Sequence, residues 1–185
     1  MSASTYTLRV LHLSDLHERV SLDWMPEERK TRILNSGADR HRVLGPALDE
    51  RLKSIAKERP PVDLLVFTGD LADWGLDKEY PEVKRRLDHV RQLLGLGWDR
   101  VFLVPGNHDI KRKEDSECWR RMRKVAEQHQ LRDALSRWLA GEQRPQGAPK
   151  GGLDNAEKRQ SGYRAFVRDI GRPELLPDGS RGHPN

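Results

Sequence analysis

Side chains that can bind a divalent cation gather in three short stretches of this sequence. The stretches are 14–17 (Ser-Asp-Leu-His), 68–70 (Thr-Gly-Asp) and 106–109 (Gly-Asn-His-Asp). Carboxylate oxygen beside imidazole nitrogen suits manganese, iron, zinc or cobalt better than calcium. Asp15 and His17 lie two residues apart, so an extended backbone would point both side chains to the same face. Together the three stretches predict one metal site.

Asp70 and Asn107 extend the predicted site to a second cation. Asp70 has two carboxylate oxygens and can bridge two ions, and Asn107 offers a neutral carbonyl oxygen. Two cations about 3.5–4 Å apart can hold a phosphoryl oxygen and stabilise both oxygens of an in-line displacement. His108 could then contact the substrate or protonate the leaving group, and Asp109 could orient His108. We therefore predict His108 and Asp109 as catalytic residues.

Each of these stretches follows a short apolar run of the kind that forms a buried strand. The runs are 8–13, 64–67 and 101–104, and they are rich in β-branched or aromatic residues. In open α/β sheets, ligands bind at the carboxyl ends of the strands, because loops from neighbouring strands converge there. Three separate positions in the sequence are thus expected to form one site in space.

Apolar residues recur at helical spacing in two segments between the predicted strands. The first segment ends before Pro60-Pro61 and the second before Gly95 and Gly97. Their stripes are Leu44, Leu48, Leu52 and Ile55, then Tyr80, Val83, Leu87, Val90 and Leu94. Alternation of strand and helix implies parallel strands with crossover helices. We therefore predict an α/β fold, a layered β-sheet with flanking helices.

The second part of the chain has a different pattern. Helices are expected around Trp119, around Trp138 and over 163–170, and no further strand is predicted. The segment 141–152 is rich in glycine and proline, which is typical of a linker or mobile loop. We predict a core at 1–110 and a helical extension at 111–185 that ends in a frayed tail.

Composition limits the class of protein. The chain has 185 residues, enough for one domain with a real core, and a formal net charge of +5. Acidic and basic residues are interspersed, so the charge permits nucleic acid as a partner without favouring it. Cys118 is the single cysteine, which fits a reducing, cytoplasmic location. No run approaches the roughly 18 apolar residues of a membrane helix, so no membrane partner is expected.

The chain resembles the calcineurin-like metallophosphoesterases. Members of that family carry Asp-X-His, Gly-Asp and Gly-Asn-His-Asp motifs at successive strand ends, and the present sequence has all three. By this resemblance the chain has four metal ligands and one residue that assists at the phosphate: Asp15, His17, Asp70 and Asn107, then His108. The resemblance implies a hydrolase, a phosphoesterase or phosphodiesterase, in which two divalent ions (Mn, Fe or Zn) activate a hydroxide for attack on a phosphoester.

The family pattern also has a second half. Members carry a lone histidine after one further strand and Gly-His-X-His after another. Here 182–185 begins like the last motif, but Asn185 stands in place of its second histidine. The resemblance thus implies the first half of an α/β/β/α sandwich in a truncated chain, with an incomplete second metal site. The missing C-terminal half, or another protein, is then the expected partner.

Two functions of different classes stay open. One is phosphoester hydrolysis, with the kind of ester undecided. The other is a truncated, catalytically silent domain with residual metal or phosphate binding or an interaction role. Two further side chains are expected to lie apart from the chemistry. Asp73 should cap the helix that follows, and His12 should face away from the site because its strand parity is opposite to that of Asp15 and His17.

Overall fold

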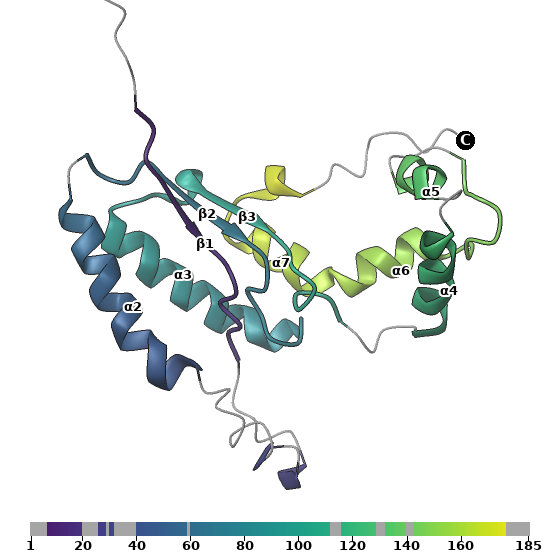
Figure 1. Cartoon of the computed structure of the whole chain (residues 1–185), viewed down its shortest axis with the longest axis horizontal. Coiled ribbons are helices and arrows are strands. Elements are labelled where there is room, and N and C mark those ends of the chain that lie inside the picture. The colour runs from purple at the N-terminus through teal and green to yellow at the C-terminus, as the bar shows by residue number, and fades with distance from the viewer. Residues whose placement is uncertain are drawn as a thin grey trace, which may run out of the picture.

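A three-stranded parallel sheet forms the centre of the fold. The computed structural model describes residues 7–19, 26–28, 30–31, 40–58, 60–111, 116–128, 132–139 and 143–176. The strands are β1 (Val10–Leu13), β2 (Leu64–Thr68) and β3 (Val101–Val104), and they lie side by side in the order β1-β2-β3. Both pairings are parallel, so all three strands end at the same edge of the sheet (Figure 1). The predicted α/β fold is confirmed.

Two long helices cover one face of this sheet. The helix α2 (Arg40–Lys57) connects β1 to β2, and α3 (Tyr80–Leu94) connects β2 to β3. Both connections step in the same direction across the sheet, so right-handed crossovers place both helices on the same face. They pack against each other, as Figure 1 shows. All five residues of the predicted second stripe are buried, and α3 ends at Gly95 in a left-handed conformation with φ of 69°.

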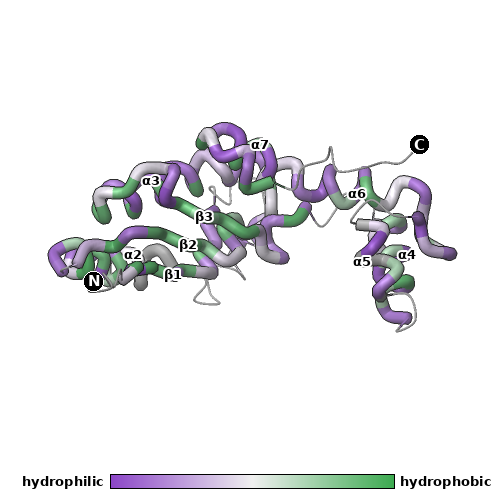
Figure 2. Tube along the Cα trace, turned by 90° about the horizontal axis from the view of Figure 1, so that it is seen from above, coloured by the Kyte–Doolittle hydropathy of each residue, from purple (hydrophilic) through white to green (hydrophobic). Residues whose placement is uncertain are grey.

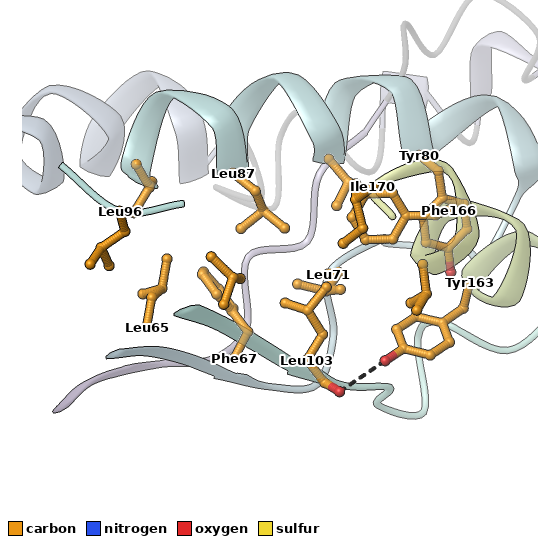
Figure 3. Packing of buried hydrophobic residues seen from close by; sticks show 14 of the residues in the cluster. Leu65, Phe67, Leu71, Tyr80, Leu87, Leu96, Leu103, Tyr163, Phe166 and Ile170 are labelled. Atoms are coloured by element: carbon orange, nitrogen blue, oxygen red, sulfur yellow. Dashed lines mark hydrogen bonds between the residues drawn. The ribbon is translucent and has the colours of Figure 1, made fainter. Parts of the chain in front are cut away.

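The hydrophobic core lies between these helices and the sheet. Leu65, Phe67 and Leu103 point from the strands towards α3, as Figure 3 shows, and each is at most 3% exposed. The helix α7 (Ser161–Asp169) closes the core over β3. Its Tyr163 hydroxyl donates a hydrogen bond of 3.0 Å to the backbone carbonyl of Leu103. A segment distant in sequence therefore packs directly on the strand that precedes the Gly-Asn-His-Asp stretch.

The opposite face of the sheet is apolar and exposed. Phe102 and Val104 alternate with the buried residues of β3 and are 38% and 54% exposed. Leu8 and Val10 continue this face at the start of the chain, with 64% and 46% exposed. His12, two residues after Val10 in β1, has its Nε2 2.6 Å from the hydroxyl of Thr68. Parallel sheets are ordinarily covered on both faces, so this surface is unusual for the fold.

The remaining helices form a second, smaller cluster. They are α4 (Ser116–Glu127), α5 (Arg132–Leu139) and α6 (Gly152–Arg159), at the end of the molecule away from α2 (Figures 1 and 2). Met122, Val125, Trp138 and Ala148 pack together there. The expected helices around Trp119 and Trp138 are confirmed, but α6 was not predicted. Its buried positions include Asn155 and Arg159, so it lacks the apolar stripe by which a helix is recognised in a sequence.

Three short 3-10 helices complete the described structure, namely η2 (Asp77–Glu79), η3 (Trp98–Arg100) and η5 (Pro173–Leu175). Within the described ranges no strand follows β3. Residues 177–185, which include the predicted tail and the partial last motif, lie outside those ranges. The division predicted at residue 110 stays a prediction. Among the described helices, none combines the length and the apolar character needed to cross a bilayer.

Candidate metal centre

The loops after the three strands meet at the carboxyl edge of the sheet. The N–H of Asp15 donates to the carbonyl of Gly69 at 3.2 Å, and the N–H of His17 donates to the carbonyl of Asp70 at 2.8 Å. The third loop joins through the N–H of His108, which donates to Oδ1 of Asp70 at 2.9 Å. The fold thus brings the three predicted stretches together.

Two glycines allow the second and third loops to touch. A Cβ added to Gly69, whose φ is +102°, would lie 2.9 Å from the Cα of Gly106. A Cβ added to Gly106 would overlap the backbone nitrogen and the carboxylate of Asp70. Real Cβ atoms do not approach other atoms so closely, and positive φ favours glycine. Both glycines are therefore needed for the carboxylate of Asp70 to occupy its place.

Three of the predicted ligands have a left-handed backbone. Asp15, His17 and Asp70 have φ values of 58°, 50° and 54°, and in the described part of the chain they are the non-glycine residues with positive φ. Such a conformation costs about 1–3 kcal/mol per residue and concentrates at functional sites. The strain in this chain therefore falls on residues that the sequence predicts as metal ligands.

The side chains of these residues form a set of metal donors. Nε2 of His17 lies 3.7 Å from Oδ1 of Asp15 and 3.8 Å from Oδ2 of Asp70. His17, Asp70 and His108 each offer a ligand atom, and these three atoms lie within 4.8 Å of one another. Imidazole nitrogen and carboxylate oxygen together match the preference of divalent transition ions. The residues present therefore fit a divalent metal.

His108 and Asn107 share the third loop. Nδ1 of His108 lies 2.7 Å from the backbone carbonyl of Asp73. A carbonyl can only accept, so this nitrogen carries a proton, and in the neutral ring the lone pair is on Nε2. The His108 ring meets the His17 ring edge-on, with centroids 4.6 Å apart. Asn107 is exposed beside His108, and its predicted role as a ligand stays a prediction.

Asp109 is fully buried and joins two of the loops. Its carboxylate accepts hydrogen bonds from the N–H groups of Leu71, Ala72 and Gly106, at 3.1, 2.9 and 2.9 Å. Burial raises the pKa of Asp109, although these three hydrogen bonds act in the opposite direction. The hydroxyl of Tyr80 lies 3.3 Å from the same carboxylate. Asp109 thus fixes the separation of the loops after β2 and β3, and its predicted catalytic role stays a prediction.

Asp73 belongs to this centre, although its position in the sequence predicts a helix cap. The N-cap of η2 is Leu76, so the predicted capping role is wrong. Oδ1 of Asp73 instead lies 3.4 Å from Nδ1 of His17 and 3.7 Å from Nδ1 of His108. A signal for this was available, because Asp73 follows Asp70 within the loop that leaves a predicted strand.

A parallel sheet with carboxylate and imidazole groups at its carboxyl edge defines a metal-binding α/β protein. Calcineurin-like phosphoesterases match residues 8–172, and the chain belongs to this family. It is also similar to the uncharacterized metallophosphoesterase-like protein YydB of Bacillus subtilis (strain 168), with 40% identity over 58 residues. That match covers 31% of this chain and 12% of the length of YydB.

Proposed function

We propose that this chain hydrolyses phosphoester bonds with the help of two divalent ions at the carboxyl edge of its sheet. The observation that carries the proposal is the convergence of three proposed ligands, since Nε2 of His17 lies 3.7 Å from Oδ1 of Asp15 and 3.8 Å from Oδ2 of Asp70. Family membership supports a metal-dependent phosphoesterase. Manganese as the metal, a phosphodiester as the substrate and a cytoplasmic location are further parts of this proposal.

The first ion would be held by Asp15, His17 and Asp70, and the second by Asp70 and Asn107. Divalent ions bound there would acidify a water molecule and stabilise the negative charge of the phosphoryl group. The chain itself orients the shared ligand, because the N–H of His108 holds one oxygen of Asp70 at 2.9 Å. The other oxygen is left to face Nε2 of His17.

His108 is the proposed proton donor to the leaving oxygen. Its Nδ1 is engaged by the backbone carbonyl of Asp73 at 2.7 Å, so Nε2 is the nitrogen left to donate a proton, which it would carry in the doubly protonated ring. The same hydrogen bond fixes the plane of the ring beside the ligand cluster. The chain therefore supplies orientation of the general acid as well as ligands.

The proposal is tested with the purified chain, Mn²⁺ and bis-p-nitrophenyl phosphate as a generic phosphodiester. Asp70→Asn keeps an oxygen for the N–H of His108 but weakens metal binding. Mutating a residue that only hydrogen-bonds to a metal ligand lowers metal affinity or activity roughly 10–100-fold. Asp70 is a proposed ligand itself, so we expect turnover to fall by more than about 100-fold in this variant. Asp154→Asn, at an exposed position of α6, is the control and should retain full activity. Equal turnover in both variants would contradict the proposal.

A second candidate is favoured by the exposed apolar face of the sheet. We propose as the alternative that these residues are a metal- or phosphate-binding part of a longer protein and do not turn over substrate alone. Val104, at 54% exposed, is the kind of residue that a further layer or a protein partner would cover. Calorimetric titration with Mn²⁺ separates the candidates: no turnover together with less than about one ion per chain would exclude the enzyme.

A further inference from the structure

We propose that Arg19 is a positioning residue of the metal centre, which holds the carboxylate of Asp73 between His17 and His108. The consequence for turnover rests on the proposed function, whereas the consequences for the His17 ring and for metal affinity do not. Neither Arg19 nor its contact was indicated by the sequence. The loops after β1 and β2 run beside each other and bring Arg19 to Asp73.

A short backbone ladder places Arg19 next to Asp73. The N–H of Glu18 donates to the carbonyl of Leu71 at 2.8 Å, and the N–H of Asp73 donates to the carbonyl of Glu18 at 3.2 Å. Glu18 and Ala72 form a parallel bridge, which continues the pairing of β1 with β2 beyond the strands. Arg19 follows Glu18 directly, and its Nε lies 2.8 Å from Oδ2 of Asp73.

The Asp73 side chain is only 9% exposed, and that of Arg19 is 22% exposed. Removing one partner of a buried ion pair leaves the other charge without compensation. The carboxylates of Asp15 and Asp70 belong to the same centre, so an uncompensated Asp73 would also be repelled by like charge. The guanidinium of Arg19 therefore stabilises Asp73 at this position. The guanidinium contacts Oδ2 of Asp73, and Oδ1 faces the two histidines.

Asp73 in turn determines which nitrogen each histidine offers. Its Oδ1 lies 3.4 Å from Nδ1 of His17 and 3.7 Å from Nδ1 of His108, and its carbonyl accepts from the latter. At 3.4 Å the carboxylate makes no hydrogen bond with Nδ1 of His17. Its negative charge on this side of the ring nevertheless favours the tautomer with the proton at Nδ1, which leaves the lone pair on Nε2 for a metal. In His17 that nitrogen faces Asp15 and Asp70. Arg19 thus acts on the His17 ring through the carboxylate of Asp73, whereas the His108 ring is held by the backbone carbonyl of the same residue.

The test compares Arg19→Met with Arg91→Met in the full chain. Nε of Arg91 donates to Asp88 at 2.7 Å, and its side chain is 21% exposed, so the control removes a similar pair within α3. Long-range proton–nitrogen NMR reports the tautomers of the histidine rings without metal, and calorimetry with Zn²⁺ reports affinity. We expect Arg19→Met to shift His17 away from the Nδ1–H tautomer and to weaken Zn²⁺ binding roughly 10–100-fold. His108 should keep its tautomer, because the backbone carbonyl of Asp73 that holds its Nδ1 is unchanged. Arg91→Met should change neither the His17 tautomer nor the Zn²⁺ affinity.

Rescue separates positioning from a purely structural role. Arg19→Lys keeps the positive charge and should recover part of the Zn²⁺ affinity, and Arg19→Gln serves as the milder variant if Arg19→Met does not fold. Lower thermal stability with an unchanged His17 tautomer and unchanged Zn²⁺ affinity would overturn the inference. Absence of phosphodiester hydrolysis by the unmodified chain would instead overturn the proposed function, while the His17 tautomer still decides the role of Arg19.

Discussion

Glu79 is a buried carboxylate that holds the loop between β2 and α3. It is 1% exposed, and its Oε2 accepts hydrogen bonds from the N–H groups of Trp74 and Leu76 at 3.1 and 2.9 Å. Desolvation outweighs these two bonds and raises the pKa of Glu79 to about 7. The loop that carries Asp73 is therefore held by a group that ionises near neutral pH.

This pKa predicts how the stability of the protein depends on pH. The pKa in the folded protein is about 7 against an ordinary value of 4.5, so between these values the folded state binds more protons than the unfolded state. Stability should therefore fall as the pH rises through this window, by about 3 kcal/mol from this group. In Glu79→Gln that contribution should vanish. Urea unfolding at pH 5 and pH 8 measures it, and identical pH slopes in the two proteins would contradict the prediction.

At the scale of elements, the metal centre depends on the close approach of the loops after β2 and β3. Their contact is made by Gly69 and Gly106, and Asp109 joins both loops through hydrogen bonds to backbone N–H groups. The pairing of β2 with β3 sets the spacing of the strands. The loops add what the strands alone do not provide, a place for the carboxylate of Asp70 beside the N–H of His108.

Gly106→Ala should disrupt the centre without removing any ligand. Its Cβ would overlap the carboxylate and backbone of Asp70, so Asp70 must shift away from His17. We expect Zn²⁺ affinity to fall by at least about 10-fold. Mutating a residue that only hydrogen-bonds to a metal ligand already lowers metal affinity by that factor. Gly151→Ala is the control, since no atom lies within 4 Å of the added Cβ. Calorimetric titration of both variants checks this, and equal affinities would exclude the steric argument.

At the scale of the whole molecule, the two faces of the sheet differ sharply. One face packs against α2, α3 and α7, while the other exposes Val10, Phe102 and Val104. The guanidinium of Arg172 lies over the Phe102 ring at 5.0 Å and covers part of that residue. Such an exposed apolar face is unusual for a parallel sheet. Because one face is buried and the other is exposed, the same substitution should lower the free energy of unfolding by different amounts on the two faces.

Val101→Thr and Val104→Thr form a matched pair for this comparison. Val101 is 0% exposed and Val104 is 54% exposed, in the same strand. A buried hydroxyl without a hydrogen bond costs about 1–3 kcal/mol, so Val101→Thr should destabilise the chain by that amount. Val104→Thr should change the free energy of unfolding by less than about 0.5 kcal/mol. Urea unfolding measures both. Equal costs would mean that Val104 is covered in solution, as by a second layer or a partner.

The sequence by itself determined the strands, the two crossover helices and the residues that converge at the strand ends. These features can be recognised from short stretches of sequence, because apolar runs, helical stripes and motifs each involve residues that lie close together along the chain. Asp15, His17 and Asp70 could be placed at one edge because parallel strands connected by helices must end together. The helix α6 escaped prediction because its buried face includes Asn155 and Arg159.

Only the tertiary structure revealed the contact between Asp73 and Arg19. Their contact depends on the loop after β1 pairing with the loop after β2, and no pattern of consecutive residues encodes that pairing. The same holds for Asp109, whose three backbone partners lie on two different loops. The exposed face of the sheet was also decided in three dimensions. The sequence of an apolar strand is the same whether one or both faces of its sheet are covered. Coverage depends on which helices the chain folds back onto the sheet.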